Sequence, residues 1–160
     1  MKTAIVWSLL GTAVVAALAA VMPVQAAEHP VPAAVAGAMA TVTLADHVKF
    51  VPLDSTDTTG HGPKVAVLFG DLKQKGPVAF LALLPAGFSA GPHTHASGSY
   101  IVSIKGNYHE FRPGEAHGKP LGAGGHLFWP ANSAHNNLCE QAGGPCLNYA
   151  YFPNGFDVKK

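Results

Sequence analysis

The most informative stretch of the sequence runs from Gly87 to Gly106 and reads GFSAGPHTHASGSYIVSIKG. It holds two histidines separated by one residue, His93 and His95, followed by an apolar run typical of a β-strand. Side chains two residues apart in an extended segment point to the same side, so the two imidazoles are expected to converge. Such a pair is a metal chelate that needs a third ligand from another strand.

The spacing of this stretch resembles the first motif of the cupin superfamily, G(x)5HxH(x)3-4E(x)6G. Gly87 and Gly106 stand at the ends of the motif, with His93 and His95 at its histidine positions. The motif's glutamate, normally a metal ligand, falls at Ser99 (at Tyr100 with the longer spacing), and neither residue is a carboxylate.

A second segment resembles the second cupin motif, G(x)5PxG(x)2H(x)3N, with Gly124, Pro130 and His135 in place. Asn132 replaces the motif's second glycine, which is a mild change because asparagine also tolerates a positive φ. Cys139 replaces the closing asparagine. The two motifs lie in the right order, and the resemblance covers roughly residues 64–152.

This resemblance implies an all-β fold, the cupin double-stranded β-helix or jelly-roll-like barrel, with a metal at its centre. It places the ligands at His93, His95 and His135 and leaves the glutamate position vacant at Ser99. Three neutral ligands leave a divalent ion its full charge and leave coordination positions open. The site resembles those of three-histidine cupins such as acetylacetone dioxygenase and the thiol dioxygenases. The chain also resembles uncharacterised cupins related to the anti-sigma factor cupin domain.

One carboxylate is a candidate replacement for the missing ligand. Glu110 follows the turn after the apolar run, and a two-residue loop at Lys105-Gly106 pairs it with Ile101 on the face of Ser99. A change of one residue in loop length reverses that face. Whether Glu110 reaches the metal is therefore open.

Three aromatic residues are further candidates for the pocket wall, with a place in the core as the alternative: Tyr100, Trp129 and Tyr149. Two histidines outside the motifs, His109 and His126, are candidates for proton transfer at the mouth of the barrel, with a surface position as the alternative.

Short apolar runs alternate with turn sequences along the rest of the chain, a pattern typical of an all-β sandwich or barrel. The expected strands cover residues 41–53 as a pair, then 64–69, 78–84, 99–104, 108–112, 126–130 and 146–152.

The N-terminus has the features of a secretory signal peptide over residues 1–26. Lys2 precedes a nearly uninterrupted apolar segment, Pro23 ends it, and Val24-Gln25-Ala26 offers small residues where signal peptidase cleaves. The alternative is a retained membrane anchor. Residues 27–40 are interpreted as an N-terminal arm and residues 41–160 as a single cupin domain. The expected location is periplasmic or secreted, with no stable membrane span after cleavage.

The two cysteines fit an oxidising compartment. Cys139 and Cys146 bracket a turn-forming loop and are expected to form a disulfide, with two free thiols as the alternative. A zinc site on them is disfavoured because the spacing is not CxxC and no second pair exists.

Composition narrows the range of functions. The 160 residues hold 10 Lys and Arg, 9 Asp and Glu, and 9 His, with a net charge of +1, so nothing favours a nucleic acid partner. No nucleophile elbow, P-loop or GxGxxG is present. The expected partners are a small molecule and, by analogy with other cupins, a second copy in a homodimer.

The sequence is compatible with two functions. The first is a metal-dependent dioxygenase acting on a small organic substrate, with iron favoured. The second is a non-catalytic sensor or carrier that binds a metal or small ligand, with zinc, copper, nickel or manganese as further candidates. A metal-free sugar-binding or isomerase cupin is disfavoured because all three histidines are present.

Overall fold

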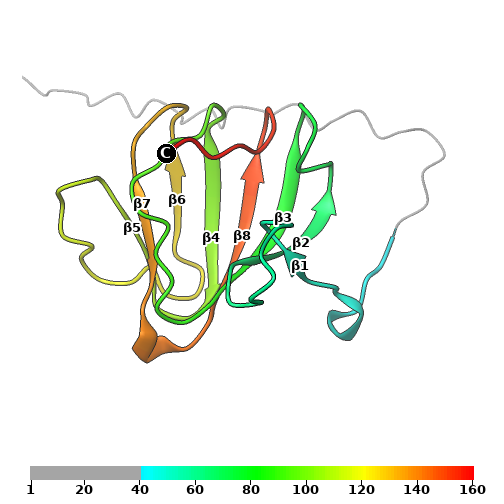
Figure 1. Ribbon diagram of the computed structural model, residues 1–160, viewed down its shortest axis with the longest axis horizontal. Helices are drawn as coiled ribbons and strands as arrows, with labels where there is room; N and C mark the ends of the chain where they lie inside the picture. Colours follow the sequence, from blue (N-terminus) through cyan, green and yellow to red (C-terminus); the bar gives the residue numbers. More distant parts are fainter. Residues whose placement is uncertain (1–40) are drawn as a thin grey trace, which may run out of the picture. The chain divides into compact units, whose positions relative to one another are not determined.

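Two antiparallel sheets make up the computed structural model, which describes residues 41–160 (Figure 1). The proposed signal peptide, residues 1–26, and the proposed arm, residues 27–40, lie outside the described residues. Val42–Lys160 forms one compact unit. Within the described part of the chain, no helix is long and apolar enough to cross a membrane.

The elements are short and nearly all are strands. In chain order they are the 3-10 helix η1 (Ala45–His47), β1 (Val51–Pro52), β2 (Lys64–Phe69), β3 (Val78–Leu84), β4 (Ser99–Lys105), β5 (Tyr108–Phe111), β6 (His126–Trp129), β7 (Asn136–Cys139), the 3-10 helix η2 (Gln141–Gly143) and β8 (Cys146–Phe152).

The larger sheet has six strands in the order β1-β2-β3-β8-β4-β6, and the smaller sheet pairs β5 with β7. The expected closed barrel is wrong in one respect, because no ladder joins the two sheets. The strands of the smaller sheet have only four residues each, and the segment between β5 and β6 is a Gly- and Pro-rich loop that forms no strand. Isolated bridges, including Ser89 with Leu138, attach the chain before β4 to β7.

Alternation along the strands determines which side chains reach the interior. In β8 every second residue is buried, so Asn148, Ala150 and Phe152 face inward. Phe152 stacks on Phe80 of β3, with ring centroids 5.8 Å apart. The buried core comprises Val65, Val78, Phe80, Leu84, Ile101, Tyr108, Cys139, Cys146, Ala150 and Phe152.

Most of the expected strands are confirmed, and two segments differ. The strand pair expected over residues 41–53 is wrong, since only Val51–Pro52 pairs and a 3-10 turn precedes it. The side chains of this segment are mostly exposed, so its weak alternation reflects no buried face. Strand β7 was not predicted, because asparagine has a low strand propensity and fills its first two positions.

The expected disulfide is confirmed. Cys139 at the end of β7 is bonded to Cys146 at the start of β8, and both residues are fully buried. Replacing both cysteines by alanine is expected to lower the free energy of unfolding by about 2–3 kcal/mol, because the bond restricts the unfolded chain. Urea titrations of the variant and the native chain measure the difference, and equal midpoints would contradict the prediction.

Gly106 allows β4 to pass close to the start of β8. It has φ +89°, and a Cβ there would lie 2.8 Å from the Cα of Cys146 and 2.8 Å from the carbonyl oxygen of Pro145. Gly106→Ala is expected to destabilise the fold by about 2–5 kcal/mol, from backbone strain and overpacking together. Gly114→Ala is the matched control, since Gly114 has φ +84° with open space around it, and strain alone predicts a loss of about 1–2 kcal/mol. Equal losses in thermal unfolding would contradict the packing argument.

Candidate metal centre

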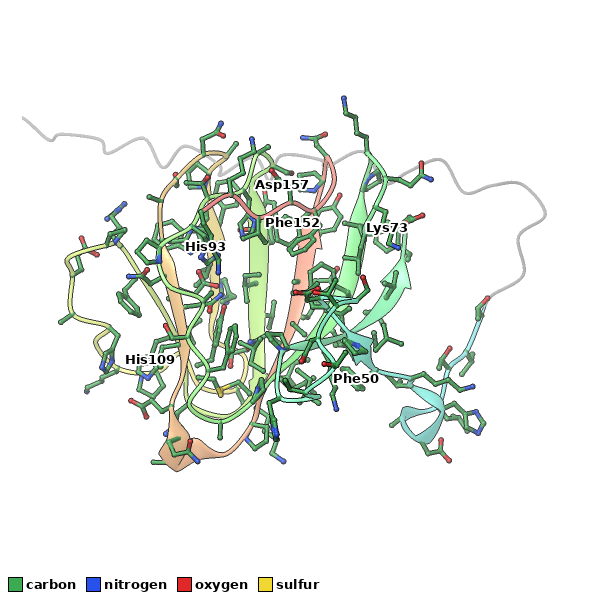
Figure 2. All side chains as sticks on the ribbon, viewed as in Figure 1. Phe50, Lys73, His93, His109, Phe152 and Asp157 are labelled. Carbon is green, nitrogen blue, oxygen red and sulfur yellow. A yellow bond between two sulfur atoms is a disulfide. The ribbon has the colours of Figure 1, made fainter. Side chains whose placement is uncertain are left out.

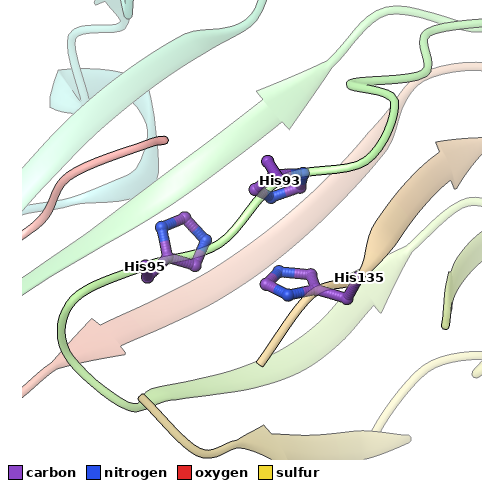
Figure 3. Close-up of side chains that lie close together, drawn as sticks. All are labelled: His93, His95 and His135. Atoms are coloured by element: carbon purple, nitrogen blue, oxygen red, sulfur yellow. The ribbon is translucent and has the colours of Figure 1, made fainter. Parts of the chain in front are cut away.

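Three buried histidines lie close together (Figure 3). His93 and His95 lie in the segment before β4, and His135 lies just before β7. Their ring centroids are 4.3–5.2 Å apart, and each offers a nitrogen within 4.8 Å of the others. All three residues are buried, with exposures of 5%, 7% and 2%. The sequence therefore named the three histidines that the fold brings together.

The backbone fixes this convergence. His93 and His135 form an isolated antiparallel bridge, in which each main-chain N–H donates to the other's carbonyl over 2.9 and 3.0 Å. The carbonyl of His95 accepts from the N–H of Asn132 at 2.7 Å. Asn132 has φ 61°, so the prediction that this asparagine takes over a glycine position with positive φ is confirmed.

Each imidazole is oriented by a hydrogen bond at Nδ1 to a main-chain carbonyl. The acceptors are Gly91 for His93 (2.9 Å), Asp157 for His95 and Ser133 for His135 (2.9 Å). A carbonyl oxygen only accepts, so each Nδ1 carries the hydrogen and each neutral ring keeps its lone pair on Nε2. This is the arrangement that orients histidines as metal ligands in proteins.

Burial keeps two of these rings, those of His95 and His135, neutral. It lowers the pKa of His135 to about 4, although the hydrogen bond to Ser133 acts in the opposite direction. Burial also lowers the pKa of His95, opposed by its contact with Asp157. Both rings are therefore neutral at neutral pH, the form in which histidine binds metal. The group fits a divalent transition metal by its donor set, its orientation and its protonation state.

Glu110 lies beside the histidines, so the fold brings a carboxylate to this group although Ser99 stands at the motif's glutamate position. Its side chain is only 3% exposed, and its Oε2 lies 3.8 Å from Nε2 of His135. The route is not the expected one, because β5 leaves the larger sheet and Glu110 pairs with Asn137 of β7, not with Ile101. The chain changes sheets at the turn after β4, where a simple hairpin had been assumed.

Two neighbours hold the carboxylate of Glu110 in place. The hydroxyl of Tyr108 donates to Oε1, and the indole N–H of Trp129 donates to Oε2. Burial raises the pKa of Glu110 to about 7, and the two hydrogen bonds act in the opposite direction. The Trp129 ring also stacks on His135, with centroids 4.9 Å apart and planes 12° apart. Glu110 and His135 are thus positioned by one shared tryptophan.

A cavity of about 120 Å³ adjoins the histidines, and most of its wall is apolar. Its polar wall residues are His93, His95, Ser99, Tyr108, Glu110, His135, Asn137 and Asn148. Ser99, at the position of the cupin glutamate, is buried and faces this cavity. The Ser99 side chain is shorter than the glutamate that the cupin motif has at this position, so it fills less of the cavity.

Two aromatic candidates do not reach the cavity. Tyr100 and Tyr149 lie on the outer face of the larger sheet, because the inward residues are their neighbours on β4 and β8. Tyr100 is 42% exposed and packs against Phe128 on that face. Trp129 differs, since it contacts the site through Glu110 and His135.

The proton-transfer candidates also lie elsewhere. His126 is exposed, and His109 is buried against Glu140, with neither among the residues that line the cavity. Tyr108 and Asp157 were not predicted as site residues from the sequence. Tyr108 stands two residues before Glu110 on one strand, so period-two alternation was a signal for it. Nothing local in the sequence indicated the Asp157 carbonyl, 62 residues from His95.

No protein-family model matches the chain, and no curated protein matches it. Solved structures do match. The polyketide cyclase RemF from Streptomyces resistomycificus has a TM-score of 0.60 at 17% identity, covering 76% of this chain and 85% of that one. An RmlC-like cupin from Shewanella frigidimarina has a TM-score of 0.56 at 16% identity, covering 74% and 95%.

A chain from the complex of Rhodobacter sphaeroides SigE with the anti-sigma ChrR has a TM-score of 0.50 at 19% identity, covering 68% of this chain and 50% of that one. These similarities and the sheet order define the class: the chain has the cupin fold. Within that fold, His93, His95 and His135 form a group that can hold a metal.

Proposed function

We propose that this protein is a metal-dependent dioxygenase-type oxidoreductase that acts on a small organic molecule. The observation that carries the proposal is the combination at the cavity: three buried, oriented imidazoles and one buried carboxylate in a mostly apolar wall. Three neutral ligands leave room for both a substrate and dioxygen at an iron(II) ion. When bound, iron(II) would supply Lewis-acid and redox chemistry toward dioxygen and substrate.

The protein's own residues divide the remaining work. His93, His95 and His135 hold the ion through Nε2. The carboxylate of Glu110, which is buried in the cavity wall 3.8 Å from Nε2 of His135, accepts a proton from the substrate. Tyr108 and Trp129 aim that carboxylate. The rings of Phe152 and Phe156 form part of the apolar wall that a small organic substrate would contact.

The cavity also restricts the class of substrate. Its volume of about 120 Å³ lies below the roughly 300–1,000 Å³ of ordinary ligand pockets. We therefore favour a small diketone or thiol over a flavonoid-sized molecule. An acidic C–H or S–H fits Glu110, and the anion left after proton loss fits a cation held by neutral ligands.

The proposed location is the periplasm or the extracellular space. The signal-like residues 1–26 support it, and so does the disulfide between Cys139 and Cys146, since disulfides persist in oxidising compartments. Fractionation of cells that express the full chain, followed by N-terminal sequencing, tests this location, and cytoplasmic protein starting at Met1 would contradict it.

The experiment that tests the activity is oxygen uptake by iron(II)-loaded protein over a panel of small diketones and thiols. The proposal expects uptake with at least one compound and none with a His93→Ala variant. No uptake across the panel with fully loaded protein would contradict it.

A second candidate is a non-catalytic cupin that binds a metal as a sensor or carrier, and one observation favours it. Oε2 of Glu110 lies 3.8 Å from Nε2 of His135, close enough to complete a closed four-ligand site for zinc. If the protein is such a sensor or carrier, Glu110→Gln is expected to weaken metal binding strongly. If the protein is a dioxygenase with Glu110 as its base, Glu110→Gln is expected to leave the metal content unchanged.

A further inference from the structure

A second group of metal-ligating side chains lies away from the candidate centre, on the β5–β7 sheet. His109 of β5, His117 of the following loop and Glu140 just after β7 each offer one ligand atom, and these atoms all lie within 4.8 Å of one another. We refer to them as the His109 cluster. Figure 2 labels both His109 and His93 and places them well apart. None of the three residues lines the central cavity.

The contact between His109 and Glu140 is unusual. The two atoms, Nε2 and Oε1, lie 3.0 Å apart, yet Nε2 has no hydrogen bond of acceptable geometry. The His109 side chain is fully buried, so water does not satisfy this nitrogen. A buried polar atom without a partner is destabilising, which makes an orphaned nitrogen next to a carboxylate a feature that needs an explanation.

The other ring nitrogen of His109 fixes the tautomer of the neutral ring. Nδ1 lies 3.3 Å from the carbonyl oxygen of His117, which only accepts, so Nδ1 carries the hydrogen. The lone pair is then on Nε2, beside an oxygen of Glu140 that also carries lone pairs. Two acceptor atoms 3.0 Å apart, with no hydrogen bond between them, are spaced as two ligands of one cation can be.

Both of these side chains are held in position by further contacts, as metal ligands are. The second carboxylate oxygen of Glu140 accepts from the side-chain amide of Asn107 at 3.0 Å, and the main-chain N–H of Glu140 donates to the Asn107 carbonyl at 3.0 Å. The preceding residue, Cys139, is anchored to Cys146 by the disulfide. The carboxylate is therefore fixed before any ion arrives.

His117 completes the group from the solvent side. Its ring lies 4.6 Å from the ring of His109 at an angle of 75°, and the residue is exposed. Glu140 is 31% exposed, so an ion has a path from solvent and a position open to water. Two histidines and one glutamate are a ligand set that zinc uses where it keeps a water ligand.

We propose that the His109 cluster is a second divalent-metal site that binds zinc and is independent of the central histidines. Its ligands are Nε2 of His109, a ring nitrogen of His117 and Oε1 of Glu140. The proposal goes beyond the proposed function and does not rest on it, because the two groups share no residue.

Calorimetric titration of metal-free full-length protein with Zn²⁺ tests the site, with the bound metal also counted after gel filtration. The native chain is expected to bind two ions. Glu140→Gln and His117→Ala are each expected to weaken one of the two sites at least tenfold while the other keeps its affinity. Both residues are partly or fully exposed, so the fold is expected to survive, and circular dichroism checks this.

The matched control is His126→Ala, which removes an exposed histidine outside the cluster and is expected to leave both sites unchanged. A second arm removes the central site with His93→Ala, after which one zinc ion is expected to remain. The proposal is overturned if the native chain binds no ion or only one ion that is lost in His93→Ala, or if the second ion survives both Glu140→Gln and His117→Ala with unchanged affinity. If the native chain binds one ion, and that ion is lost in Glu140→Gln and His117→Ala but kept in His93→Ala, the central site is empty. That result would contradict the proposed function and leave the His109 cluster in place.

Discussion

Replacing His135 by alanine is expected to reduce the metal at the central site from about one ion per chain to background. The ring of His135 supplies one of three neutral nitrogen ligands, and its Nδ1 is already committed to the Ser133 carbonyl. Only His93 and His95 then remain as ligands, and both lie in the segment before β4. The site loses its one ligand from the segment before β7. Both proteins also carry Glu140→Gln, which removes the second proposed site. They are loaded with iron(II) or zinc and gel-filtered, and their metal content is then measured.

A second readout is stability. Any ion that binds only the folded chain stabilises it, by about 2.7 kcal/mol at a free concentration one hundred times the dissociation constant. The metal is therefore expected to raise the melting temperature of the Glu140→Gln protein, which keeps only the central site, and not that of the Glu140→Gln/His135→Ala protein. His47→Ala, an exposed histidine outside both clusters, is the control and should behave as native. An unchanged metal content in His135→Ala would contradict the assignment.

The second large effect is expected from Glu110→Gln. Glutamine keeps the shape of the side chain and can still accept from Trp129, but it cannot take a proton. If Glu110 is the general base, the substitution lowers the turnover rate by about 10²–10⁴-fold and leaves the metal content unchanged. Steady-state oxygen uptake and metal analysis of the same preparation measure both quantities.

Tyr108→Phe is the matched variant for Glu110→Gln, because it removes only the hydroxyl that aims Oε1. We expect it to reduce the rate less than Glu110→Gln does and to preserve the metal. Full activity in Glu110→Gln would contradict a role for this carboxylate. Loss of the metal together with activity would assign Glu110 as a ligand and favour the non-catalytic candidate.

The sequence predicted the fold well because two segments resemble the cupin motifs, and that resemblance implied both the fold and the three histidine ligands. The HxH pair and His135 were named in advance since two residues on an extended chain share a side, and the second motif placed the third histidine. The exchange of glycine for Asn132 was also predictable, because a positive φ is a property of one residue. Strands such as β3 and β8 were clear from apolar content and alternation.

The remaining features depend on long-range pairing that the local sequence does not encode. Glu110 reaches the site only because the chain changes sheets after Gly106, so that β5 pairs with β7. Strand β7 was not predicted, since two asparagines fill its first two positions. Tyr100 was misplaced because an aromatic residue next to a motif fits either face of a strand. The orphaned nitrogen of His109 follows from the approach of Glu140, 31 residues away, which no motif marks.

The central claim is that one metal ion is bound by three imidazole nitrogens of this chain. Anomalous diffraction from crystals of the iron- or zinc-loaded protein, recorded at the absorption edge of the metal, tests it most directly. The account predicts a peak about 2.0–2.2 Å from Nε2 of His93, His95 and His135. Loaded crystals with no peak among these three rings would contradict it.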